Sequence, residues 1–130
     1  MERTDVNPWE WSKQFGFSQA VDLRQPQRLL VCSGQTAIQA DGSPPATEDM
    51  GEQVRAAFAN LGDVLSAAGY TAADVVRINY YTTDVDALIQ VLHAGAHEFF
   101  GDNLPASTLL GVTRLAYPQL KTEIEAIAAG

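Results

Sequence analysis

The stretch that decides the fold is Thr122-Glu123-Ile124-Glu125-Ala126-Ile127-Ala128, close to the end of the chain. Its composition predicts a β-strand. A second strand is predicted from Ser107 to Leu115, and the turn Tyr117-Pro118-Gln119 separates the two. We therefore expect a hairpin of two strands at this end of the chain.

Upstream of this hairpin, the segment from Asp49 to Ala68 predicts a helix. Asp49 and Glu52 fit a capping box at its start, and Gly69 can end it. Its apolar residues recur at helical spacing: Val54, Phe58, Leu61 and Leu65. This helix is the most clearly marked element of the sequence.

A central strand and a second helix follow. The sequence Val75-Val76-Arg77-Ile78-Asn79-Tyr80-Tyr81 is rich in β-branched and aromatic residues, which favours a strand. The segment from about Val85 to Phe100 predicts a helix, with Asp84 or Thr83 as its N-cap and Gly101 just beyond its end. The aromatic residues of these two segments are expected in the core rather than against a ligand.

The first third of the chain predicts two strands, from Gly16 to Leu23 and from Arg28 to Gln35, joined as a hairpin. The apolar run Leu29-Leu30-Val31-Cys32 indicates a strand covered on both faces. The complete order is ββαβαββ, which predicts an α+β fold with two helices packed on one face of a mixed sheet. The other sheet face then needs a cover, and oligomerisation is the simplest source of one.

Composition limits the classes of function. We expect a single domain over residues 1–130, because one core suffices for this length and 46% hydrophobic residues argue against disorder. The formal net charge of −8 disfavours binding to nucleic acid. No apolar run is long enough for a membrane span, and the acidic start lacks the features of a signal peptide, so we expect a cytoplasmic protein.

Three side chains are of metal-binding or nucleophilic type. Cys32 is the single cysteine, so it cannot form an internal disulfide, and we expect a buried, inert thiol. His93 and His97 lie four residues apart and share a helix face. A working zinc site needs three protein ligands and no third one follows, so we expect no metal and no other cofactor.

Seven short segments occur in the order and approximate spacing of the RidA (YjgF/L-PSP) family, which this chain resembles over nearly its whole length. They are Gly16-Phe17-Ser18-Gln19-Ala20-Val21, Ser33-Gly34-Gln35, Asn60-Leu61 with Ala67-Ala68-Gly69, Thr83-Asp84, Glu98-Phe99-Phe100, Pro105-Ala106 and Glu123-Ile124-Glu125-Ala126-Ile127-Ala128. The resemblance implies a chorismate-mutase-like fold and a homotrimer with small-molecule sites in the clefts between subunits. Characterised relatives hydrolyse enamines and imines to keto acids and ammonia.

The resemblance fails at the position of the arginine that binds the substrate. The deaminases of the family have Pro-Ala-Arg-Ser where this chain has Pro105-Ala106-Ser107-Thr108, so Ser107 replaces the arginine that holds the substrate carboxylate. A hydroxyl cannot reproduce the charge-assisted, bidentate bonds of a guanidinium. Arg114 cannot substitute, because it lies seven residues further on and on the opposite strand face. Ordinary imino acids are therefore expected to bind poorly.

The resemblance also assigns candidate site residues. Glu123 corresponds to the pocket glutamate that places the attacking water, and His93 falls where relatives have a pocket asparagine. Expected substrate-binding residues are Phe17, where many relatives have tyrosine, together with Ser33, Gly34, Ser107 and Thr108. From the residues alone, Glu123 can also be a solvated or ion-paired carboxylate and His93 a surface histidine.

Two classes of function follow. The first is a hydrolase or deaminase of an imine, enamine or related nitrogen compound, without a redox cofactor. The second is a non-catalytic trimer of the same fold that binds a small ligand or regulates a partner. Ribonuclease activity is sometimes attached to the family name, but the acidic balance and the lack of a basic patch argue against it.

Overall fold

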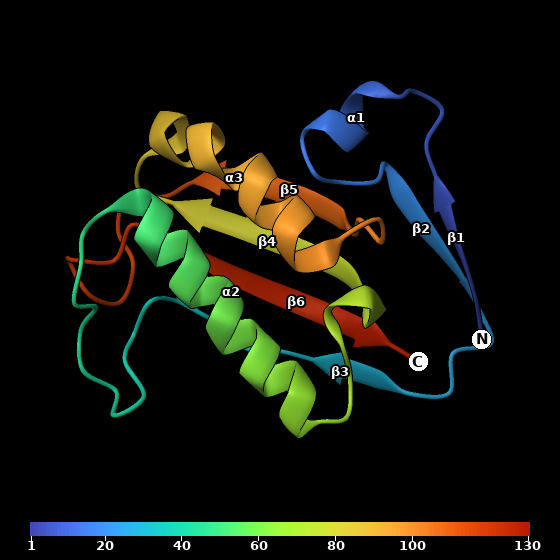
Figure 1. Cartoon of the computed structure of the whole chain (residues 1–130), viewed down its shortest axis with the longest axis horizontal. Helices are drawn as coiled ribbons and strands as arrows, with labels where there is room; N and C mark the ends of the chain where they lie inside the picture. Colours follow the sequence, from blue (N-terminus) through green and yellow to red (C-terminus); the bar gives the residue numbers. More distant parts are fainter.

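A computed structural model describes all residues 1–130. Four strands form a mixed sheet in the order β3 (Leu29–Val31), β6 (Thr122–Ala129), β4 (Val75–Thr82) and β5 (Ala106–Gly111). β6 is antiparallel to both of its neighbours, whereas β4 and β5 are parallel. The helices α2 (Met50–Ala67) and α3 (Val85–Phe100) cover one face of this sheet (Figure 1). The predicted α+β fold is confirmed.

The helix boundaries agree with the capping residues of the sequence. The Asp49 side chain accepts the N–H of Glu52 at 3.0 Å at the start of α2, and Asp84 accepts the N–H of Ala87 at 3.1 Å at the start of α3. Only half of the predicted capping box forms, because the N–H of Asp49 donates to Thr47 instead. A glycine follows each helix end in the left-handed region, with φ +81° at Gly69 and +61° at Gly101.

The core lies between the two helices and the sheet. Side chains of β4 and β6 alternate between its two faces, so every second residue points toward the helices. Ile78 and Ile124 meet Leu61 and Leu65 of α2 and Leu88 of α3 in one buried cluster. Burial of each of these side chains stabilises the fold by about 1.5–3 kcal/mol.

Both predicted hairpins are wrong. β2 (Ala20–Arg24) pairs with β1 (Glu2–Val6) in a separate two-stranded sheet and not with β3. β5 and β6 do not pair either, because β4 lies between them. Local turn signals cannot reveal that β4, buried at alternate positions from Val76 to Thr82, takes the centre of the sheet and pairs along both of its edges.

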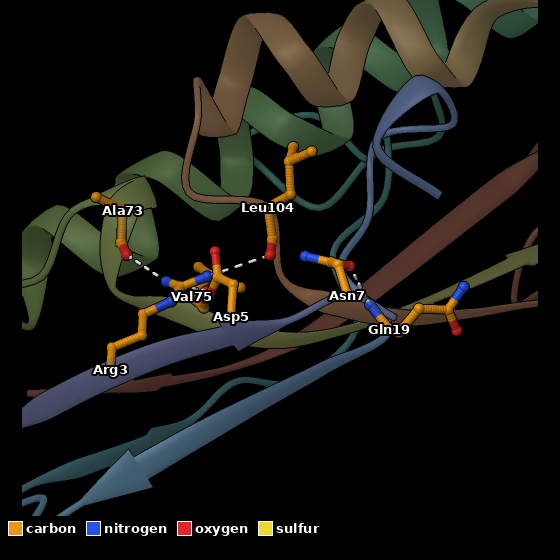
Figure 2. Close-up of polar contacts among 7 residues, drawn as sticks. All are labelled: Arg3, Asp5, Asn7, Gln19, Ala73, Val75 and Leu104. Atoms are coloured by element: carbon orange, nitrogen blue, oxygen red, sulfur yellow. Dashed lines mark hydrogen bonds and ion pairs between the residues drawn. The ribbon is translucent and has the colours of Figure 1, made fainter. Parts of the chain in front are cut away.

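The sequence also gave no sign of β1 or of the short helix α1 (Trp11–Gln14). β1 is short and polar, and it is anchored through Arg3, whose guanidinium donates to the carbonyls of Ala73, Val75 and Leu104 at 2.8, 3.1 and 3.2 Å (Figure 2). Ala73 belongs to the 3₁₀ turn η1 (Ala72–Asp74). These contacts fix the two-stranded sheet of β1 and β2 to the main sheet.

The long connection before β6 is held by one buried amide. Gln53 of α2 is fully buried, and its Nε2 donates to the carbonyls of Thr47 and Gln119 at 2.8 Å each. Its Oε1 accepts the N–H of Lys121 at 2.7 Å. Gln53 therefore pairs three backbone groups of two loops that are far apart in the sequence.

Replacing Gln53 should destabilise the fold strongly. Gln53→Leu keeps the volume but leaves three backbone groups without partners, which should lower the free energy of unfolding by about 3 kcal/mol. Chemical denaturation measures this loss, with the exposed Gln90→Leu as control, expected to change stability by less than about 0.5 kcal/mol. Equal stabilities of the two variants would contradict the assigned role of Gln53.

Candidate functional site

The face of the sheet that no helix covers carries the Glu123 carboxylate. Glu123 pairs with Tyr81 across β6 and β4, and both side chains point away from the helices. The two edge strands carry exposed apolar side chains: Leu29 and Val31 on β3 are 62% and 75% exposed, and Leu110 on β5 is 52% exposed. The expectation that the Leu29–Cys32 segment is covered on both faces is therefore wrong for the single chain, because β3 lies at the sheet edge with one face open.

Glu123 is a half-buried carboxylate with no hydrogen-bond partner in the chain. Burial raises its pKa, and the negative charge of neighbouring Glu125 raises it further. The carboxylate lies directly over Gly34, where a Cβ atom would collide with it. Glycine at position 34 therefore makes the space that the Glu123 side chain occupies.

Glu125 differs from Glu123 although both lie on the same face of β6. The hydroxyl of Tyr81 donates to Glu125 at 2.5 Å and the amide of Asn79 donates at 3.1 Å. These bonds, led by the one from Tyr81, lower the pKa of Glu125. The two carboxylates thus differ in acidity, because the pKa of Glu125 is lowered and that of Glu123 is raised.

A second group of candidate residues lies on the helix side of the sheet, around a cavity of about 290 Å³. Eight residues line this cavity, and six of them are hydrophobic. The lining consists of Phe15, Phe17, Tyr80, Ile89, Leu92, His93, Ser107 and Leu109. No lysine or arginine belongs to it, so no guanidinium or ammonium group is available there to bind a carboxylate.

Strand register explains which residues reach the cavity. Ser107 of β5 pairs with Ile78 and therefore points toward the helices. Thr108 pairs with Asn79 and points to the opposite face, where its hydroxyl accepts a hydrogen bond from Arg77 at 2.6 Å. The structure brings Phe17, His93 and Ser107 together, but it separates Thr108 from them.

The remaining predicted residues lie on the other side of the sheet. Gly34 contacts Glu123, as described above, and the neighbouring Ser33 is exposed. Glu123 and Ser107 therefore belong to two half-sites on opposite faces. We call them the carboxylate half-site (Ser33, Gly34 and Glu123) and the cavity half-site (Phe17, His93, Ser107 and the other cavity residues).

The segment around α1 forms one wall of the cavity. Gly16 has φ +83°, and a Cβ atom there would lie 2.8 Å from the Cβ of Ala96 on α3, so only glycine allows this close approach. The ring Nε2 of His97 lies 2.9 Å from the carbonyl of Lys13 and so carries the proton of a hydrogen bond to it. These contacts place Phe15 and Phe17 over the cavity.

Sequence reasoning missed several cavity residues and misplaced one aromatic side chain. Phe15 and Ile89 gave no signal, and Tyr80 was predicted as core. Tyr80 is indeed buried, but it also lines the cavity. Tyr81 points to the uncovered face and binds Glu125, contrary to the expectation of a core residue.

Cys32, a candidate nucleophile, and His97, a candidate metal ligand, are both engaged in the packing of the fold. Cys32 is buried, and burial raises the pKa of its thiol, which disfavours the reactive thiolate. His97 is engaged with the backbone of Lys13, so it is not free to join His93 in binding a metal ion. Nucleophilic cysteine chemistry has no support in this arrangement.

The protein thus has a small α+β fold, a mostly apolar cavity on the helix side of its sheet and a separate acidic centre on the other side. The chain belongs to the endoribonuclease L-PSP family, whose model matches residues 12–130. Among solved structures, the Rid-family protein YyfB of Yersinia pestis is 36% identical, with 99% of both chains covered and a TM-score of 0.90. The resemblance to the RidA family is confirmed.

Curated relatives are similar over most of their length. Protein mmf2 of Schizosaccharomyces pombe is 30% identical over 99% of both chains, and its name places that protein in mitochondria. The 2-iminobutanoate/2-iminopropanoate deaminase of Dermatophagoides farinae is 30% identical over 85% of this chain and 83% of its own.

None of the helices has the length and apolar character required to cross a bilayer. The cytoplasmic location stays a prediction.

The two carboxylates should affect stability in opposite directions as the pH changes. The folded pKa of Glu123 is raised above 4.5, so folding is favoured at low pH and this contribution is lost as pH rises through the raised pKa. Glu123→Gln should therefore have a higher melting temperature than the wild type at pH 8, and the gain should shrink at pH 4.

Glu125→Gln is the matched control. The folded pKa of Glu125 is lowered, so its contribution to stability is present above the ordinary carboxyl pKa and is lost as pH falls. This variant should melt below the wild type at pH 8 and approach it in acid. Thermal unfolding at equal protein concentration measures both, and pH responses of the same sign would show the assignment to be wrong.

Proposed function

We propose that this protein is a RidA-like hydrolase that deaminates a small imine, enamine or related nitrogen compound in a site shared between subunits. The observation that carries the proposal is the separation of the candidate residues onto two faces of one sheet. A single chain cannot bring Glu123 to Ser107, whereas a second copy placed against the uncovered face can supply the missing half-site.

Exposed apolar surface supports the association of subunits. Leu29 and Val31 on β3 and Leu110 on β5 are exposed, and exposed apolar patches favour burial in an interface. The RidA resemblance implies a homotrimer with its ligand in the clefts between subunits, which agrees with this requirement. Partner subunits and a small ligand are thus the proposed partners, without nucleic acid or membrane.

The proposed reaction is hydrolysis of a C=N bond. Glu123 accepts a proton as water adds to the imine carbon and returns it to the nitrogen, which gives a neutral carbinolamine. Glu123 then accepts the proton of the new hydroxyl and passes it to the amino nitrogen as the C–N bond breaks, which yields the carbonyl product and ammonia. The raised pKa of Glu123 supports its role, since a general base works best with a pKa near the operating pH.

The cavity half-site is proposed to hold the substrate. His93 lies on the exposed rim of the cavity, where a ring N–H can donate a hydrogen bond to the leaving nitrogen. Ser107 supplies a hydroxyl, and Phe17 supplies an aromatic wall. In this proposal, the other subunit supplies Glu123. The glycine at position 34 of that same subunit leaves room for the carboxylate.

The absence of a cationic side chain in the cavity favours a second candidate function. A trimer that binds a small molecule without turnover needs the cavity but not a proton acceptor. Loss of the family arginine agrees with this role, whereas retention of Glu123 over Gly34 agrees with catalysis. The two candidates differ in whether any substrate is consumed.

Oligomeric state tests the shared site. We expect a homotrimer of about three times 14.0 kDa by light scattering at micromolar concentration. Val31→Lys introduces a charge on the uncovered sheet face and should shift the mass toward the monomer, whereas Val6→Lys, on the N-terminal strand, should not. A monomeric wild type would contradict the proposal.

Glu123→Gln tests turnover. Imines generated in situ by a flavin amine oxidase or an amino-acid oxidase serve as substrates, and ammonia release is measured. The substitution preserves shape but removes the proton acceptor, so kcat should fall by roughly 10²–10⁴-fold with little change in KM. Gly34→Ala should lower kcat as well, because the added methyl group displaces the carboxylate.

Outcomes of this assay separate the two candidate functions. Substrate consumption with unchanged kcat in Glu123→Gln would remove Glu123 from the mechanism. Ligand binding without consumption of any imine by the wild type would favour the binding trimer.

A further inference from the structure

The cavity contains a polar group that the protein leaves without a partner. Tyr80 lines the cavity and is only 2% exposed, and its hydroxyl is buried with no hydrogen bond. Its ring packs edge-on against Phe58 with centroids 6.3 Å apart, so the core restricts its position. Buried hydroxyls are nearly always paired, and an unpaired one beside a cavity indicates a partner that binds there.

The chemistry of this hydroxyl defines what it can bind. Burial raises the pKa of Tyr80 above its ordinary value, so the phenol is protonated at neutral pH. It can therefore donate its proton to a carbonyl oxygen or an imine nitrogen. The neighbouring Tyr81 has the same side chain, but it already donates to Glu125 on the opposite face.

Charge excludes one class of ligand. No lysine or arginine lines the cavity, and His93 lies at its exposed rim. Moving a carboxylate into such a place removes its water without supplying an opposite charge, which is strongly unfavourable. The buried part of the ligand is therefore uncharged.

The volume and the side chains of the cavity further limit the class of ligand. Phe15, Phe17, Ile89, Leu92 and Leu109 give the cavity apolar walls. A dry cavity of about 150 Å³ holds benzene, so 290 Å³ accommodates an apolar group with on the order of ten non-hydrogen atoms. An aromatic ring or a branched hydrocarbon with one short polar substituent fits these limits.

We propose that the cavity binds the uncharged end of an aryl- or branched-alkyl-substituted imine or carbonyl compound, and that the Tyr80 hydroxyl donates a hydrogen bond to its nitrogen or oxygen. The substrate class is thus neutral imines rather than imino acids. The identification of the ligand as a substrate rests on the proposed function, whereas the binding chemistry does not.

Three ligands of one shape test the proposal by calorimetric or NMR titration. Benzamide has a ring and an uncharged carbonyl, benzoate replaces the amide by a carboxylate, and α-methylstyrene has neither charge nor acceptor. We expect benzamide to bind at least tenfold more tightly than benzoate. Ser107→Arg should reverse this order, because it adds a guanidinium to the lining.

Tyr80→Phe isolates the hydroxyl. The substitution should lower the affinity for benzamide by about tenfold, as expected for one lost hydrogen bond. The affinity for α-methylstyrene should not change. The melting temperature without ligand should not fall, because the hydroxyl has no partner to lose. Tyr70→Phe, another buried tyrosine outside the cavity, is the control and should alter neither affinity.

Each outcome decides the proposal. Benzoate binding as tightly as benzamide, no binding of either neutral ligand, or equal benzamide affinity in Tyr80→Phe and the wild type would overturn it. If the neutral ligands bind as expected but no neutral imine from an amine oxidase is hydrolysed, the ligand class stands and the proposed hydrolase function fails.

Discussion

The antiparallel pairing of β4 with β6 is the constraint on which the rest of the structure depends. These two strands form the centre of the sheet, and their register fixes which residues face the helices. Ile78 and Ile124 enter the core, and Glu123 is thereby directed to the opposite face. The acidic centre is a geometric consequence of the same pairing that buries the core.

The alternation along β4 gives two adjacent tyrosines different chemistry. Tyr81 donates to Glu125 and keeps that carboxylate ionised, which in turn helps to raise the pKa of Glu123. Tyr80 points to the helix side and lines the cavity, and its buried hydroxyl has no hydrogen-bond partner in the chain. A shift of the register by one residue would exchange these roles and place two carboxylates in the core.

The cavity depends on parts of the chain that are distant in sequence. Ser107 comes from β5, His93 from α3 and Phe17 from the segment before β2. That segment is held over α3 by the close approach of Gly16 to Ala96. The two-stranded sheet of β1 and β2, which Arg3 anchors, holds its other end (Figure 2). Ser107 lies in a lining that contains no lysine or arginine, and this set of side chains determines what the cavity can hold.

The sequence by itself determined the two long helices α2 and α3, the strands of the main sheet and the family, because caps, periodicity and strand composition are local properties. Asp49, Asp84 and Gly69 lie at the helix ends that their types predict. Only the tertiary structure decided which strands pair and which candidate residues meet, since both depend on register between segments far apart in the chain. Ser107 and Thr108 show this most directly: adjacent in sequence, they point to opposite faces, and only pairing with β4 decides which one lines the cavity.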